Sequence, residues 1–344
     1  MKPSVVFTTL LLLLAACTPL SEPGTVTPGP EEPIGVTFHF RAPSRPGTKA
    51  TAPADEEAIN SFQLILFRGG ALFQTASVQG ESVTLQLSGG TYDCYAVANS
   101  PVDWTGYGSL TASAFEGTLA ALTDNSATSF VMVGKSTETV TAATSEIEIG
   151  ADRLLSRVVL NKVTLDLSGT PYAGQTLTIN SIFLTNVNSA VFYGRTPAGA
   201  SLADGRTWYN KLGAQDAPAV NAFLRETSLG IALADGSSTS GTAYHYFYAC
   251  PNPSTAEDPL DAWPSASSQA PCTRLVLECT LDGRTCYYHL NLPGMLCNRS
   301  YEIGNCIIRN MGGPDPEHNL ETGDVQFSLT VNDWITESPV NETF

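Results

Sequence analysis

The sequence predicts an all-β protein with two tandem β-sandwich domains that follow an exported N-terminus. Three observations lead to this prediction. Apolar residues alternate with period two along many short segments, residues such as Gly, Pro and Asn separate the segments, and helical periodicity is weak. Short, regularly spaced strands of this kind are typical of sandwiches or barrels, and we expect transthyretin-like or Greek-key connections.

The N-terminus carries an export signal. Lys2 supplies positive charge, an apolar stretch runs from Val5 to Leu14, and Cys17 follows Leu14-Ala15-Ala16. This pattern predicts a secretory signal peptide over residues 1–16, because its apolar run is too short to span a bilayer. A cysteine after Leu-Ala-Ala resembles the bacterial lipobox, so we expect Cys17 to be lipidated and to anchor the protein in the outer membrane. The alternative is an ordinary signal peptide with an incidental cysteine.

The rest of the chain divides into a tether and two domains. Residues 17–33 are rich in Pro, Gly, Thr and Glu and predict a flexible tether. About 330 residues remain after the leader, which exceeds one typical domain. The polar stretch 142–152 separates two groups of expected strands. We therefore predict an N-terminal sandwich at 34–150 and a C-terminal sandwich at 151–344.

The expected strands are short runs of alternating apolar residues. Only residues 216–229 have a pattern compatible with a short helix. The runs cover residues 35–40, 62–67, 83–87, 92–97, 128–133, 157–167, 176–185, 244–249, 275–281, 285–292, 301–309 and 325–331, with a short further run at 340–344.

Charge and motifs exclude several classes of protein. The 344 residues carry a formal net charge of −16, which disfavours nucleic acid as a partner. The sequence contains no nucleophile elbow, zinc-protease helix, phosphate-binding loop or dinucleotide fingerprint, so we expect neither an enzyme nor a cofactor. The carboxylates of Asp55-Glu56-Glu57 lie in a polar segment, where we expect them to be solvated. The four His residues are scattered and no C-x-x-C spacing occurs, which disfavours a metal site.

Seven cysteines follow Cys17, and export would permit disulfides among them. Asp282-Gly283 predicts a two-residue hairpin turn that sets Cys279 opposite Cys286, with Cα atoms about 5.5 Å apart. Cys279–Cys286 is therefore one predicted disulfide. By exclusion, Cys250–Cys272 and Cys297–Cys306 are the other two, although six cysteines allow 15 pairings that sequence does not decide. Cys94 lies within an expected strand, where we expect a buried apolar side chain.

The order of many weak motifs resembles the Bacteroidales fimbrillin superfamily, which comprises subunits and anchors of type V pili. The likeness covers nearly the whole chain, and the cysteine-rich hairpin is a departure from it. The residues that carry the likeness are the lipobox at 14–17, residues 59–67, 89–99 and 153–163, Cys250-Pro251-Asn252-Pro253, residues 298–301 and 312–316, and Val331-Asn332-Asp333-Trp334.

The resemblance implies a surface fimbria whose subunits assemble with other fimbrial subunits and support adhesion to host or bacterial surface ligands. Related shaft subunits lose their tether and first strand to a trypsin-like cut after an arginine. Here Arg41 before Ala42 is the candidate, since Arg45 precedes Pro46. The vacated groove then receives a C-terminal segment of another subunit, as in donor-strand complementation.

Residues 325–344 are the candidate donor segment, and the alternative is that they complete their own domain. The apolar residues of this segment are Val325, Phe327, Leu329, Val331, Val340 and Phe344.

Two other functions stay open at this point. One is a fimbrial anchor that keeps its lipid. The other is a glycan-binding or adhesive β-sandwich lipoprotein on the cell surface, which would need aromatic rings exposed together. Candidates for such rings are Trp208-Tyr209, residues 244–248 and Trp263. Trp334 is expected to be a buried anchor rather than a sugar platform.

Overall fold

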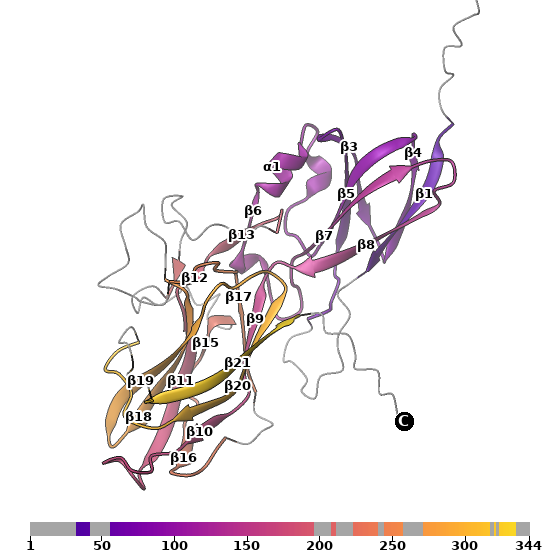
Figure 1. Ribbon diagram of the computed structural model, residues 1–344. Coiled ribbons are helices and arrows are strands. Elements are labelled where there is room, and N and C mark those ends of the chain that lie inside the picture. Colours follow the sequence, from indigo (N-terminus) through magenta and orange to yellow (C-terminus); the bar gives the residue numbers. More distant parts are fainter. Residues whose placement is uncertain are drawn as a thin grey trace, which may run out of the picture. The chain divides into compact units, whose positions relative to one another are not determined.

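The computed structural model describes residues 32–41, 56–195, 208–210, 223–239, 244–256, 271–316, 320 and 323–334. Within these ranges the regular secondary structure is almost wholly β-strand (Figure 1), so the predicted all-β class is confirmed. The helical elements named there are α1 (Ala112–Glu116) and the short 3-10 helices Trp104–Gly106 and Leu122–Asp124, and residues 223–224 are helical as well. No helix among the described residues is long and apolar enough to cross a membrane. The signal peptide, Cys17 and most of the tether lie outside the described residues.

A seven-stranded sheet holds most strands of the first part of the chain. Its order is β3-β2-β5-β7-β8-β1-β4, so β1, the first of the described strands, lies between β8 and β4 (Figure 1). The bounds are β1 (Ile34–Arg41), β2 (Phe62–Arg68), β3 (Ala71–Val78), β4 (Ser82–Leu87), β5 (Gly90–Ala98), β7 (Met132–Val140) and β8 (Glu146–Arg153).

Two five-stranded sheets follow. In one, β20 pairs with β9, β10 and β21, and β17 pairs with β9; in the other, β11 pairs with β15, β16 and β18, and β18 pairs with β19. The bounds are β9 (Ser156–Leu160), β10 (Val163–Leu165), β11 (Thr176–Thr185), β15 (Arg225–Glu226), β16 (Ile231–Ala234), β17 (His245–Ala249), β18 (Thr273–Leu281), β19 (Arg284–Leu292), β20 (Arg299–Ile308) and β21 (Val325–Asp333).

Two small pairs complete the set of named strands. They are β6 (Leu119–Ala121) with β13 (Ala190–Phe192), and β12 (Val187–Asn188) with β14 (Trp208–Tyr209). Buried apolar side chains from all three larger sheets belong to one hydrophobic core cluster. The division of the chain at 150/151 stays a prediction.

The β18–β19 hairpin forms as its turn sequence predicts. Asp282 and Gly283 both have positive φ, at 51° and 73°, as a two-residue type I′ turn requires. The resulting register sets Leu281 opposite Arg284 and Cys279 opposite Cys286.

Other elements differ from the expectations. The strand β8 lies where we expected a polar linker, because its Glu residues point outward while Ile147, Ile149 and Ala151 are buried on the other face. The expected run 157–167 is broken into β9 and β10, and β3 was not predicted. Half of the expected helix, residues 216–222, lies outside the described residues; within the other half Phe223 and Leu224 are helical and Arg225–Glu226 is strand β15.

Candidate assembly site

The strand β1 occupies a slot between β4 and β8. It runs antiparallel to β4 and parallel to β8. Val36 and Phe38 are fully buried and Phe40 is 6% exposed, so one face of β1 belongs to the core. On the other face, the hydroxyls of Thr37 and Thr84 lie 2.9 Å apart. Removal of β1 would therefore expose an apolar slot and leave backbone groups of β4 and β8 without their partners.

The outer face of this slot is acidic on the β8 side. Glu146 lies opposite Thr37 and Glu148 lies opposite His39. Arg41 forms a two-point contact with Glu148, with Nε at 2.9 Å from Oε1 and Nη2 at 3.1 Å from Oε2. Both side chains are mostly exposed, at 69% and 54%, so this ion pair is a weak contact that salt can screen.

The candidate processing site lies at the end of β1. Arg41 is the last residue of the strand and is exposed, whereas Ala42 lies outside the described residues. Accessibility is what a protease needs of a substrate side chain, and the structure gives Arg41 that property. Cleavage between Arg41 and Ala42 stays a prediction.

The strand β21 carries part of the candidate donor segment and pairs with β20 in its own sheet. Val325, Phe327 and Leu329 are half-buried, while Val331 is 49% exposed. Residues 325–333 thus complete their own sheet here, which is the alternative that the sequence left open. Val340 and Phe344 lie outside the described residues, and a donor role for the segment stays a prediction.

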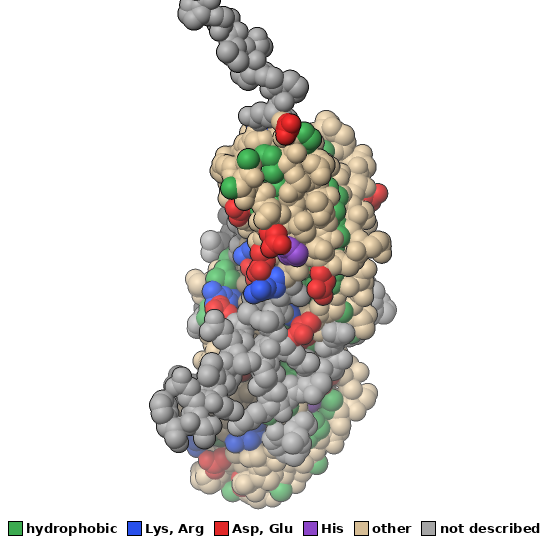
Figure 2. Space-filling view, turned by 90° about the vertical axis from the view of Figure 1, so that its right-hand side faces the viewer, with side chains coloured by type: hydrophobic (Ala, Val, Ile, Leu, Met, Phe, Trp, Pro, Cys, Tyr) green, Lys and Arg blue, Asp and Glu red, His purple; other side chains and the backbone are tan. Residues whose placement is uncertain are grey.

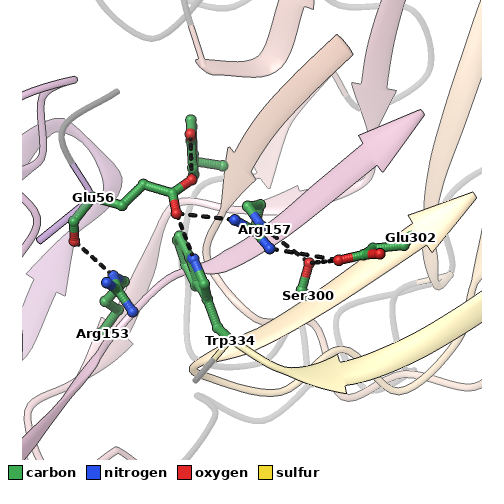
Figure 3. Close-up of polar contacts among 7 residues, drawn as sticks. Glu56, Arg153, Arg157, Ser300, Glu302 and Trp334 are labelled. Carbon is green, nitrogen blue, oxygen red and sulfur yellow. Dashed lines mark hydrogen bonds and ion pairs between the residues drawn. The ribbon is translucent and has the colours of Figure 1, made fainter. Parts of the chain in front are cut away.

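A buried cluster surrounds the carboxylate of Glu56 (Figure 3). Its Oε2 accepts hydrogen bonds from Arg157 Nη1 and from Trp334 Nε1, both at 2.9 Å, and its Oε1 accepts one from the Tyr248 hydroxyl at 2.8 Å. The backbone carbonyl of Glu56 accepts a bond of 2.8 Å from Arg153 Nε. We call these five residues the Glu56 cluster.

Aromatic contacts complete the Glu56 cluster. The rings of Tyr248 and Trp334 stack with centroids 5.7 Å apart, and the guanidinium groups of Arg153 and Arg157 lie 4.7 and 5.6 Å from the Trp334 ring. Beyond the cluster, Arg157 also contacts Ser300 and Glu302. The prediction that Trp334 is a buried anchor agrees with its 2% exposure.

Burial changes the pKa of two members of the cluster. Desolvation lowers the pKa of Arg153 to about 10, opposed by the nearby charge of Glu56. Burial raises the pKa of Tyr248, and its hydrogen bond to the Glu56 carboxylate adds to the effect. Arg153 and Arg157 are both buried, and Glu56 supplies the negative charge that offsets their positive charges.

The expectation that Glu56 is solvated was wrong. Glu56 is only 5% exposed, because the chain turns inward just before β2 and meets two arginines from β8 and β9. The sequence did contain a signal for this arrangement. Arg153 and Arg157 flank the apolar run that leads into β9, and buried arginines need an anion or a carbonyl as partner.

The structure changes the cysteine assignments. Cys279 and Cys286 face each other as predicted, and both are buried thiols in this structure. Cys297 and Cys306 do not come together, so this predicted pair is wrong. Cys306 lies seven residues into β20 from Arg299, about 23 Å along an extended strand, beyond the reach of a disulfide from Cys297.

The Cys250–Cys272 pair stays a prediction. Both residues are buried, and the side chain of Asn252 donates to the carbonyl of Pro271 and to Thr273, the two neighbours of Cys272. The loop ends that carry the two cysteines are therefore adjacent.

The aromatic candidates for a glycan platform do not form an exposed group among the described residues. Trp208 and Tyr248 are buried, and Tyr209, Tyr244 and Tyr246 are half-buried. Trp263 lies outside the described residues. Within the described ranges, no group of three or more His, Cys, Asp or Glu side chains is placed to hold a metal ion.

Part of the chain matches a known family of proteins. The model of the family described as "Major fimbrial subunit protein (FimA)" matches residues 36–189, which include most of β1 and the rest of the seven-stranded sheet. Residues 36–189 are thus similar to the FimA family of fimbrial subunits. The fimbrillin resemblance predicted from the sequence is thereby confirmed. The family is one of structural subunits and not of enzymes.

Several solved bacterial proteins have a similar fold. A fimbrilin (FimA) from Porphyromonas gingivalis is 12% identical, with a TM-score of 0.58 over 90% of this chain and 99% of its own. A Bacteroides eggerthii protein named for a proposed role in cell adhesion is 16% identical, with a TM-score of 0.59 over 90% and 98%. A similarly named protein of Parabacteroides distasonis is 17% identical, with a TM-score of 0.58 over 91% and 99%. Among curated protein sequences, none matches this chain.

Proposed function

We propose that this protein is a structural subunit of a bacterial cell-surface fimbria, exported as an outer-membrane lipoprotein through Cys17 and assembled by strand exchange at the β1 slot. The observation that carries the proposal is the position of β1. This strand lies inside a sheet, between β4 and β8, and ends at an exposed arginine. A cut at that point would release β1 and its tether while the six other strands of the sheet stay on one chain.

The energetic reason for exchange follows from the geometry of the slot. An empty slot exposes the contacts of Val36, Phe38 and Phe40 together with unpaired backbone groups on both sides. An extended segment with apolar residues at every second position restores both kinds of contact. The segment would come from another subunit, which makes the slot an assembly site.

The test begins with the N-terminus of the protein isolated from its native cell surface. Intact mass and peptide sequencing should show a chain that starts at Ala42, together with high-mass polymers on gels run without heating. The variant Arg41→Ala should keep the lipidated N-terminus and abolish the polymers. Arg45→Ala is the matched control and should process normally, because Arg45 precedes Pro46.

A mature chain that still begins at acylated Cys17 would overturn the strand-exchange step. It would favour a fimbrial anchor that keeps its lipid, or an adhesive surface lipoprotein. The acidic surface is compatible with a fimbrial anchor and with an adhesive surface lipoprotein. On the face shown in Figure 2, acidic side chains are scattered among neutral surface, in keeping with the net charge of −16.

A further inference from the structure

The two borders of the β1 slot differ in charge on their outer face. On the β4 side, Ser82, Thr84 and Gln86 present neutral polar groups opposite β1. On the β8 side, Glu146 and Glu148 present two exposed carboxylates. The slot therefore accepts neutral side chains along one border and favours cations along the other.

β1 itself places a cation at the acidic border, because two nitrogens of Arg41 contact the carboxylate of Glu148. His39 lies directly opposite the same glutamate. If the chain is cut after Arg41, the guanidinium leaves together with β1. Glu146 and Glu148 then remain at an empty slot without this cation.

We infer that the strand which replaces β1 comes from a different protein and carries a basic side chain beside Glu148. This inference rests on the proposed function, because it describes the partner of the slot that strand exchange would open. The partner segment has apolar residues in place of Val36, Phe38 and Phe40. On its other face it has an Arg or Lys in place of Arg41 or His39.

The candidate donor segment of this chain lacks that feature. Residues 325–344 contain Asp333, Glu337 and Glu342, and no Lys, Arg or His. Placing the apolar face of β21 in the slot would turn Gln326, Ser328, Thr330 and Asn332 outward, since neighbouring residues of a strand point to opposite faces. None of these side chains can neutralise Glu146 or Glu148. A second copy of this chain would therefore leave both carboxylates without a cation, so at low ionic strength the slot favours a heterologous junction.

The test uses the full chain without its leader, with a site for a specific protease inserted after Arg41. Cutting at this site leaves β1 bound without a covalent link. A fluorescent peptide of residues 33–41, with an amidated end, is then exchanged into the slot and displaced by competing peptides. The competitors are the unlabelled peptide, its Arg41→Glu variant and a peptide of residues 325–333.

The Arg41→Glu peptide should bind about tenfold more weakly at low ionic strength, because one exposed attraction becomes a repulsion. The peptide of residues 325–333 should also bind more weakly than the β1 peptide. Raising the salt concentration to about 0.5 M should shrink the Arg41→Glu difference. A protein with both Glu146→Gln and Glu148→Gln is the matched control and should bind the Arg and Glu peptides within about twofold of each other.

The outcomes separate the inference from the proposed function. Equal binding of the Arg and Glu peptides to the unmutated slot would overturn the charge selection while leaving strand exchange intact. Tight binding of the 325–333 peptide, at or above the affinity of β1, would overturn the heterologous partner. Failure of every peptide to exchange, including β1 itself, would overturn the proposed function and this inference with it.

Discussion

The indole Nε1 of Trp334 donates a hydrogen bond of 2.9 Å to the carboxylate of Glu56, which lies 278 positions earlier in the chain. Glu56 opens the described segment that leads into β2, and Trp334 directly follows β21. Glu56 therefore follows the region after Arg41, where the proposed cut occurs, and Trp334 lies in the candidate donor segment. The Glu56 cluster thus holds one residue at each of these two regions in place.

Glu56→Ala should destabilise the protein strongly. The change removes the acceptor of three side-chain hydrogen bonds and leaves Arg157 buried without its carboxylate. Removing one partner of a buried ion pair typically costs about 3–5 kcal/mol in the free energy of unfolding. Urea unfolding followed by fluorescence measures this loss. Glu148→Gln, which removes an exposed carboxylate, is the control and should change the stability by less than about 1 kcal/mol. Similar losses in both variants would contradict the central role of Glu56.

Trp334→Phe separates the hydrogen bond from the packing of the ring. Phenylalanine keeps an aromatic ring against Tyr248 but cannot donate to Glu56. We expect a loss of about 1–3 kcal/mol for the hydrogen bond and the smaller ring, and about 3–5 kcal/mol for Trp334→Ala. Denaturant titration of both variants tests the difference. If the two variants were equally stable, packing of the ring would contribute nothing beyond the hydrogen bond.

The sequence predicts the strands with clear apolar alternation. It misses β8, in which charge masks the alternation, and β3, whose side chains are nearly all exposed or half-buried. The β18–β19 hairpin follows from Asp282-Gly283 alone, because few residue pairs accept positive φ at both turn positions. Strand β8 was mistaken for a linker because its outward residues are glutamates, although Ile147 and Ile149 keep the alternation. The error lay in weighing composition above periodicity.

The candidate site was predictable in part. Residues 35–40 and 325–331 follow from local alternation, and both are strands in the structure. Their neighbours could not be predicted, since pairing between distant segments is set by the packing of the whole sheet. The Glu56 cluster was missed for the same reason. Its members come from five segments of the chain, and only the two arginines near β9 hinted at a buried anion.

Phe38→Ala should weaken the packing of β1 between β4 and β8 and so lower the stability of the protein. The Phe38 side chain is fully buried at the centre of the strand, and truncation of such a ring typically costs about 3–5 kcal/mol. Thr37→Ala is the control on the opposite face, where loss of the contact with Thr84 should cost about 1 kcal/mol or less. Thermal unfolding of the uncleaved chain measures both. Comparable effects of the two changes would mean that β1 is not held by its apolar face.

Cys94 provides a test of burial that depends on pH. Desolvation raises the pKa of its thiol from 9.0 to about 12, with smaller contributions from Glu138 and Asp93. The folded state therefore keeps this proton at a pH where the unfolded state has lost it. Its contribution to stability is complete below about pH 9 and is lost as the pH rises towards 12.

Pulsed alkylation with iodoacetamide, followed by peptide mass analysis, reads this effect directly. At pH 8.5 Cys94 should react at least about a hundredfold more slowly in the folded protein than in urea, because only the thiolate is nucleophilic and burial also blocks access. The Cys94→Ala variant should remove part of the decline in stability between pH 9 and 12, since the alanine carries no ionisable proton. Rapid labelling of Cys94 in the folded chain would contradict its burial on the core side of β5.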